Sequence, residues 1–214
     1  MEGKAPRIPD SVVRRLPVYL RHLQTILEND VETIASQTLG EALGLNPAQI
    51  RKDLAYFGAF GQKGVGYDVR FLILSIERIL RIHRDVPVAL IGAGRLGAAL
   101  CLYNQIQVQR GQNRMRIISV FDRDPAKTGS VIGNVAVEPD NHLESALRSR
   151  NIRIAVIAVP ASDAQAVADR LTAAGVTAML NFAPVALRVA DSVHVRAADF
   201  TSELQSLAYY AFDE

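Results

Sequence analysis

The sequence predicts an α/β protein with an N-terminal winged helix-turn-helix domain, a Rossmann-type parallel-sheet domain and a C-terminal helix. Three observations predict this. Residues 36–57 carry two helical patterns joined by a short glycine-containing turn. After Pro87, apolar runs alternate with helical patterns, which is typical of a parallel sheet covered by helices on both faces. The first of these runs leads directly into a glycine-rich turn, VALIGAGRLG at 88–97.

Composition allows two small domains and favours no single partner. The 214 residues are 49% apolar and carry a net charge of +2, with 12 basic and 9 acidic residues through Arg84 and 12 and 13 after it. The single cysteine, Cys101, excludes a disulfide within the chain and suits a reducing compartment. No apolar run approaches the length of a membrane span, and the N-terminus lacks a signal-peptide core. We therefore expect a soluble, cytoplasmic protein with no membrane partner.

The first domain, expected over 1–85, contains four helical patterns. They cover residues 16–27, 36–43, 46–57 and 69–82. Asn46 is a good N-cap, Pro47 suits the first helical position, and Gln49 stands where a capping-box partner belongs. The glycines of GAFGQKGVG at 58–66 predict a tight hairpin, the wing. Asp85-Val86-Pro87 ends the domain.

The helix over 46–57 has a basic face once its apolar stripe is assigned to the core. Arg51 can make a bidentate contact with guanine, and Lys52 can contact a base or a phosphate. Each cation taken singly is explained by a solvated helix face, but the capped helix, the basic face and the wing together favour DNA. The candidate DNA-binding residues are Arg14, Arg15, Ser36, Asn46, Gln49, Arg51, Lys52, Tyr56, Lys63 and Tyr67.

The second domain, expected over 86–198, alternates strands and helices. The apolar runs lie at 88–91, 117–121, 153–159 and 177–182, with a further strand at 192–196. The helical patterns lie at 95–107, 141–149 and 162–174, and the C-terminal segment 199–214 carries a last one at 201–212. Such alternation predicts a doubly wound sheet with its ligand at the carboxyl ends of the strands.

The glycine-rich turn predicts a dinucleotide site. Gly92 permits the tight turn, Gly94 lets backbone approach a pyrophosphate, and Gly97 allows close packing of helix on strand. Asp122 follows the next strand, where a carboxylate can accept both ribose hydroxyls and repel a 2′-phosphate, which favours NAD(H) over NADP(H). Arg123 is the competing signal, because a basic residue there can bind that phosphate. A turn cap before Pro125 is the structural alternative for Asp122.

The nicotinamide end of the site is expected at the ends of two later strands. Val159-Pro160-Ala161 and Asn181-Phe182 are mostly apolar. Placing the cationic oxidised ring in an apolar pocket without a counter-charge is costly. We therefore expect the site to prefer NADH, with NAD⁺ competing more weakly.

The sequence offers little for catalysis. None of the four histidines lies beside the predicted nicotinamide segments, no substrate domain follows residue 185, and no metal-ligand spacing is present. Cys101 falls within the helix after the glycine turn and is expected to be buried. We therefore expect no enzyme and no metal. Two alternatives stay open: an NAD-dependent oxidoreductase, and a regulator that binds another nucleotide such as coenzyme A.

The chain resembles the Rex family of bacterial redox-sensing transcriptional repressors. The resemblance rests on RRLPVYLR (14–21), ALGLNPAQIRKDLAYFGAFGQKGVGYDV (42–69), VALIGAGRLGAAL (88–100), FDRDPAKTG (121–129), VIAVPASDAQAVADRL (156–171), GVTAMLNFAPV (175–185) and ELQSLAYY (203–210). It implies a homodimer that binds a palindromic operator, a C-terminal helix swapped between subunits, and release from DNA by NADH. Thr38 departs from the family pattern, which usually has an acid there.

The resemblance also implies roles for individual residues. Those expected at the pyrophosphate are Gly92, Ala93, Gly94, Arg95, Leu96 and Gly97, and those at the adenosine ribose are Asp122, Arg123 and Lys127. Those expected along the nicotinamide side are Val159, Pro160, Ala161, Asn181 and Phe182. Tyr103 and Phe200 suit closing that pocket, with Phe200 coming from the other subunit.

Overall fold

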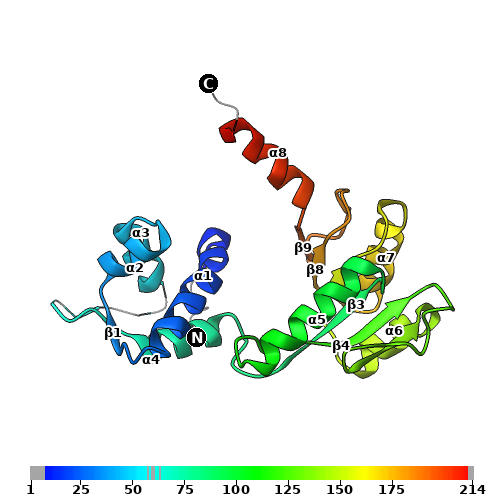
Figure 1. Ribbon diagram of the computed structural model, residues 1–214, viewed down its shortest axis with the longest axis horizontal. Helices are drawn as coiled ribbons and strands as arrows, with labels where there is room; N and C mark the ends of the chain where they lie inside the picture. The colour runs from blue at the N-terminus through cyan, green and yellow to red at the C-terminus, as the bar shows by residue number, and fades with distance from the viewer. Residues whose placement is uncertain (1–7, 57, 59–60, 63, 212–214) are drawn as a thin grey trace, which may run out of the picture. The chain divides into compact units, whose positions relative to one another are not determined.

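The computed structural model describes residues 8–56, 58, 61–62 and 64–211 (Figure 1). The chain forms two compact units, one up to Arg84 and one from Asp85 onward. Each unit has its own buried apolar core and is described by itself. This is the two-part α/β fold that the sequence predicts.

The first unit is helical with one minimal sheet. Its elements are α1 (Asp10–Leu27), β1 (Thr33–Ile34), α2 (Ser36–Leu43), α3 (Pro47–Ala55), β2 (Tyr67–Asp68) and α4 (Val69–Ile79), and β1 pairs antiparallel with β2. Gly44 ends α2 with a left-handed backbone at φ 63°, and Asn46 caps α3 by accepting a hydrogen bond from the Ala48 N–H at 2.8 Å. The predicted helix-turn-helix is thus present. Its first helix begins at Asp10, not at the predicted residue 16, because Val12 extends the buried stripe of α1 by one turn.

The glycine-rich hairpin of the first unit is described only in part. Gln62 and Gly66 exchange two backbone hydrogen bonds, of 2.8 and 2.9 Å, which agrees with the tight hairpin that the glycines predict. Lys63, a candidate DNA contact at its tip, lies outside the described residues.

The second unit is a seven-stranded sheet covered by helices. Its strands are β3 (Val86–Ile91), β4 (Met115–Asp122), β5 (Val131–Ile132), β6 (Val135–Pro139), β7 (Ile154–Ile157), β8 (Ala178–Asn181) and β9 (His194–Ala197), in the order β5-β6-β4-β3-β7-β8-β9. Its helices are α5 (Arg95–Gln109), the 3-10 helix η1 (Asp140–His142), α6 (Leu143–Ser149), α7 (Ala161–Ala173) and α8 (Phe200–Ala211).

The β5–β6 hairpin was not predicted from the sequence. β5 pairs antiparallel with β6, whereas the other neighbouring strands run parallel. Both strands are short and half exposed, so they lack the continuous apolar run of a buried parallel strand. The signal was the Gly133-Asn134 pair between Val-rich segments, which is a hairpin turn.

Alternate residues of β3 serve the two faces of the sheet. Val88 and Leu90 pack with Cys101 of α5, while Ala89 and Ile91 pack with α6 and α7. Figure 1 shows α5 on one face and α6 and α7 on the other. Since β3, β4 and β7 are parallel neighbours, their carboxyl ends meet at one edge, and the loops that follow them form the site.

Candidate functional site

The turn after β3 is closed so tightly that two of its glycines admit no side chain. Gly92 has a φ of 101°, and a Cβ there would collide with the carbonyl oxygen of Ala158. A Cβ on Gly97, in the first turn of α5, would collide with the carbonyl oxygen of Gly92. These collisions are with backbone, so the first and third glycines are required by the fold itself.

The middle glycine of the turn faces open space. Gly94 is the N-cap of α5 in extended backbone, and a Cβ there would meet no atom of the described residues within 4 Å. No side chain in the described part of the chain caps this helix. The first-turn N–H groups of a helix have no partners within the helix, and they attract anions. The turn therefore leaves an open position beside Gly94, next to N–H groups of a kind that attract anions.

Asp122 ends β4 next to this turn and is 8% exposed. Its carboxylate accepts hydrogen bonds from the N–H of Ala93 at 2.8 Å, the N–H of Asp124 at 2.9 Å and the Lys127 ammonium at 2.8 Å. Burial by itself raises the pKa of Asp122, but these donors, Lys127 first, outweigh it and hold the pKa below its ordinary value. Asp122 is therefore an ionised acceptor at neutral pH, fixed in place on the glycine turn.

A cavity of about 690 Å³ lies over the turn. Its lining residues are Ile91, Gly92, Gly94, Arg95, Leu96, Phe121, Asp122, Arg123, Asp124, Lys127, Asp140, Ala158, Val159, Pro160, Asp163, Ala166, Val167 and Arg170. They come from the ends of β3, β4 and β7 and the loops after them, and from α5, η1 and α7. A site at the carboxyl ends of the strands is what the crossover topology predicts. The volume is within the range of about 300–1,000 Å³ for small-molecule sites.

Nine of the sixteen predicted cofactor residues line this cavity, and seven do not. Ala93 and Gly97 build the turn instead, through the hydrogen bond to Asp122 and the contact with Gly92. Asn181 is buried with its amide bonded to its own loop, donating to the carbonyls of Ala183 and Val185, so it braces that loop. The remaining four, outside the cavity lining of this single chain, are Ala161, Phe182, Tyr103 and Phe200.

Three charged residues of the cavity wall were not predicted from the sequence: Asp140, Asp163 and Arg170. Asp163, in the first turn of α7, pairs with Arg123 at 2.8 Å. Arg170 of α7 binds Asp140 at 2.7 Å and Glu144 at 2.6 Å, which ties α7 to η1 and α6. No motif marks these residues, because their partners lie tens of positions away in the sequence.

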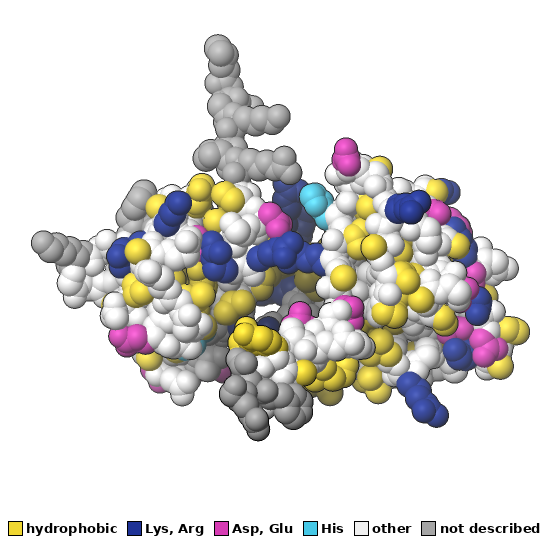
Figure 2. Space-filling view, turned by 90° about the horizontal axis from the view of Figure 1, so that it is seen from above, with side chains coloured by type: hydrophobic (Ala, Val, Ile, Leu, Met, Phe, Trp, Pro, Cys, Tyr) yellow, Lys and Arg dark blue, Asp and Glu magenta, His cyan; other side chains and the backbone are white. Residues whose placement is uncertain are grey.

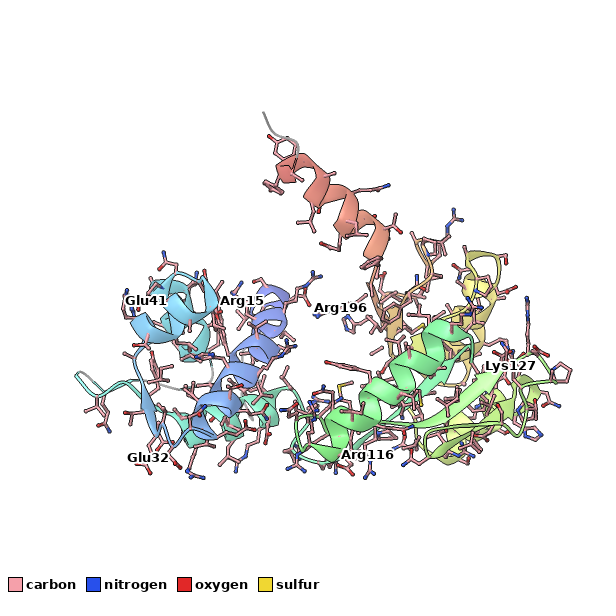
Figure 3. All side chains as sticks on the ribbon, viewed as in Figure 1. Arg15, Glu32, Glu41, Arg116, Lys127 and Arg196 are labelled. Carbon is pink, nitrogen blue, oxygen red and sulfur yellow. The ribbon has the colours of Figure 1, made fainter. Side chains whose placement is uncertain are left out.

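The first unit contains a buried charged network beneath α3. Asp53 of α3 is fully buried. Arg15 of α1, which Figure 3 labels, donates to both carboxylate oxygens of Asp53, at 2.6 and 2.9 Å. Tyr19 and Gln49 also donate to this carboxylate, at 2.7 and 2.6 Å. Burial raises the pKa of Asp53, but the hydrogen bonds, that of Arg15 first, bring it below its ordinary value. The network fixes α3 on α1.

Three of the candidate DNA-binding residues are engaged within the first unit. Arg15 was expected to contact a phosphate, but its guanidinium is paired with the buried carboxylate of Asp53. Tyr67 is 8% exposed and belongs to the apolar core, because β2 turns it inward. The Gln49 amide likewise donates a hydrogen bond to the Asp53 carboxylate.

The outer face of α3 keeps its exposed cations. Arg51 and Lys52 are exposed, and Arg51 donates to the Ser36 hydroxyl at 3.0 Å. Tyr56 is half-buried after the end of the helix, and Arg14 is exposed on α1 in an ion pair with Asp10. Figure 2 shows Lys and Arg side chains exposed on the first unit, at the left of the view. The helix-turn-helix therefore carries the basic face that the sequence predicts.

Among the described residues, no group of three or more His, Cys, Asp or Glu side chains is placed to hold a metal ion. Within the same residues, no helix is both long enough and apolar enough to cross a bilayer.

Each unit matches a known family model, and almost the whole chain matches a named relative. Residues 7–55 match the family model described as a putative DNA-binding protein N-terminus, and residues 83–185 match the one described as a CoA binding domain. A protein of Brevibacillus brevis named redox-sensing transcriptional repressor Rex is 46% identical over 208 residues, covering 97% of this chain and 99% of that protein.

Solved structures of a Rex-family repressor called RSP match almost the whole chain. The complex with β-NAD⁺ and operator DNA is 35% identical with a TM-score of 0.87, covering 96% of this chain and 93% of that one. The complex with β-NADH is 33% identical with a TM-score of 0.82, covering 95% and 94%.

Proposed function

We propose the function of this protein from one premise: the chain belongs to the Rex family of redox-sensing transcriptional repressors. We infer that its first unit binds palindromic operator DNA and that NADH, bound in the cavity of its second unit, releases it. NAD⁺ competes for the same cavity. The observation that carries the proposal is one chain that joins a basic helix-turn-helix to a glycine-turn cavity with a buried, ionised Asp122. The relatives are named repressors, so the family is one of regulators and not of enzymes.

The residues present fit a dinucleotide. The open position at Gly94 and the uncapped start of α5 suit a pyrophosphate, with Arg95 and Leu96 beside it. Asp122 has acceptor capacity for ribose hydroxyls, and Lys127 stands next to it. Val159 and Pro160 extend the lining toward the nicotinamide end, where we also place Ala161, Asn181 and Phe182. The cofactor supplies binding energy that differs between two arrangements of the protein, and no covalent chemistry.

The glycines of the turn separate folding from ligand binding. We expect Gly94→Ala to fold normally, because its Cβ meets open space, yet to bind NADH about tenfold more weakly, because the methyl group occupies the phosphate position. Gly97→Ala is expected to disturb the second unit itself, because its Cβ meets backbone. Circular dichroism and NADH titration measure the two effects. Equal NADH affinity in Gly94→Ala would remove the pyrophosphate from this position.

A homodimer accounts for the exposed apolar face of α8. Five large apolar side chains of α8 are 51–75% exposed, namely those of Phe200, Leu204, Leu207, Tyr209 and Tyr210. The Tyr103 side chain on α5 is 62% exposed. Exposed apolar surface on this scale marks a protein interface. We infer that α8 is exchanged between subunits and that Phe200 and Tyr103 close the nicotinamide pocket in the dimer. Analytical ultracentrifugation of the full chain tests this, and a monomer at micromolar concentration would contradict it.

The exposed cations of α3 are proposed to read the operator. We expect Arg51→Ala to lose about tenfold or more in operator affinity and to relax preference at one base pair. Lys52→Ala is expected to weaken binding to all sequences and to flatten the salt dependence by about one unit of slope. Operator affinity at several salt concentrations measures both. The matched control is Arg21→Ala, which removes an exposed cation from α1.

Release from operator DNA by NADH is explained by the spacing of the two recognition helices in a dimer. A dimer that reads a palindrome holds its recognition helices about 34 Å apart, or a multiple of that distance. If NADH binds more tightly to an arrangement in which this spacing is lost, it shifts the population away from the DNA-bound form. We place this action in the cytoplasm, where bacterial operators lie.

Equilibrium titration separates this proposal from its two alternatives. NADH, NAD⁺ and coenzyme A are added in turn to the full-length protein in calorimetry. We expect NADH to bind most tightly, NAD⁺ more weakly and coenzyme A least. Tightest binding of coenzyme A would favour the nucleotide regulator that the second family model suggests, and turnover of NADH with a carbonyl substrate would favour an oxidoreductase.

A further inference from the structure

Arg123 is the residue on which cofactor choice depends. It directly follows Asp122, and a basic side chain at this place can bind the 2′-phosphate of NADP(H). In the structure, however, its Nη1 lies 2.8 Å from Oδ1 of Asp163 in α7. Arg123 and Asp163 both line the cavity, one following β4 and the other following β7. The guanidinium is thus engaged with α7.

Asp163 is the fixed partner of this pair, and Arg123 is the movable one. The Asp163 side chain is 25% exposed, and its second oxygen, Oδ2, is buried with no hydrogen-bond partner among the described residues. The Arg123 side chain is 70% exposed. A largely buried carboxylate is costly without a cation. Asp163 therefore holds Arg123 in place, and loss of the Asp163 charge releases a long, exposed arginine side chain.

The charge of Asp122 does not by itself exclude a 2′-phosphate. Lys127 bonds to its carboxylate at 2.8 Å and offsets that charge. The charged residues of the whole lining balance one another, with four acidic and four basic side chains. Without Asp163 the lining carries one net positive charge, and the Arg123 guanidinium loses its partner. Asp163 thus adds a negative charge to the cavity and fixes the position of the Arg123 side chain.

We propose that Asp163 is a specificity-determining residue that holds Arg123 away from the ribose and keeps the cavity selective for NADH over NADPH. The inference rests on the proposed function, because it requires that the cavity binds NADH. It assigns to α7 a part in selectivity that the turn motif of β3 and β4 does not contain.

Titration of the full-length protein with NADH and NADPH tests the inference. Asp163→Asn keeps the size of the side chain and removes its charge. We expect the ratio of the NADPH dissociation constant to the NADH dissociation constant to fall about tenfold in this variant, because NADPH binds more tightly than it does to the parent. The gain should shrink with added salt, because Arg123 is exposed. The double variant Arg123→Gln/Asp163→Asn should bind NADPH as the parent does.

A matched control and a second variant make the result decisive. Asp169→Asn removes an exposed charge from the same helix and should change neither affinity. Asp163→Ser replaces Asp163→Asn if circular dichroism shows that the latter is unfolded. Parental NADPH affinity in the folded variant, or an undiminished gain in the double variant, overturns the inference while NADH still binds. Failure of the parent to bind NADH overturns the proposed function instead.

Discussion

Asp122→Asn is expected to bind NADH about tenfold to a hundredfold more weakly than the parent and to stay on operator DNA at NADH concentrations that release the parent. The substitution removes a charged acceptor for the ribose hydroxyls, and a hydrogen bond to a charged group contributes about 1.5–3 kcal/mol. It also takes away the charge that Lys127 neutralises. Calorimetry with NADH and operator-binding assays measure the two effects.

The control for Asp122→Asn is Asp85→Asn in the same unit. Asp85 is an exposed carboxylate paired with Arg116 at 2.7 Å, so its loss changes net charge equally without touching the cavity. We expect parental behaviour from it. Because the pKa of Asp122 is held below its ordinary value of about 4, its contribution to NADH binding should be constant from about pH 5 to 8. Unchanged NADH affinity in Asp122→Asn would contradict its place at the ribose.

The second large effect is expected at Asp53. Replacing it with Ala leaves the Arg15 guanidinium and the Tyr19 hydroxyl without their common acceptor beneath α3. Breaking a buried ion pair costs about 3 kcal/mol or more of folding free energy. Hydrogen exchange of the first unit should rise accordingly, and operator binding should weaken because α3 loses its fixed position. Exchange in the second unit and NADH binding should stay as in the parent.

The neighbouring ion pair supplies the control. Arg14 and Asp10 form an exposed i,i+4 pair at 2.7 Å, and such pairs contribute less than about 0.5 kcal/mol. Asp10→Ala should therefore leave exchange in the first unit almost unchanged. Equal effects of Asp10→Ala and Asp53→Ala would refute the special place of the buried network.

The pH dependence of the first unit follows from the same network. The pKa of Asp53 is lower in the folded protein than its unfolded value of about 4. Its stabilising contribution is therefore complete above about pH 4 and is lost as the pH falls through the depressed folded value. Acid unfolding of the first unit should begin below pH 4 in the parent, and Asp53→Ala should lack this component.

The sequence predicted the fold because its local signals agree with the tertiary structure. The cap at Asn46, the left-handed Gly44 and the turn after β3 are each recorded within a few residues. Alternating apolar runs gave the parallel strands, since strands buried on both faces are continuously apolar. The β5–β6 hairpin lacked such a run and was missed.

The parts of the site that the sequence did not predict are long-range pairs. Arg15 and Asp53 lie 38 positions apart, and Arg123 and Asp163 lie on separate elements of the cavity wall. In a sequence, an arginine that pairs with a buried carboxylate cannot be distinguished from one that contacts a phosphate. Only the fold distinguishes Arg15, which holds α3, from Arg51, which stays exposed. The fold also shows what the sequence does not, that the Asn181 amide donates to the Ala183 carbonyl and accepts from the Ala183 N–H.

Fluorescence anisotropy of a labelled palindromic operator, selected by this protein from a random duplex pool, tests the central claim most directly. The full-length protein is bound to the duplex at one stated salt concentration, because phosphate contacts make affinity salt-dependent. NADH and NAD⁺ are then titrated separately. The account predicts that NADH releases the DNA at concentrations at which NAD⁺ does not. Operator binding that neither form of the cofactor changes would contradict it.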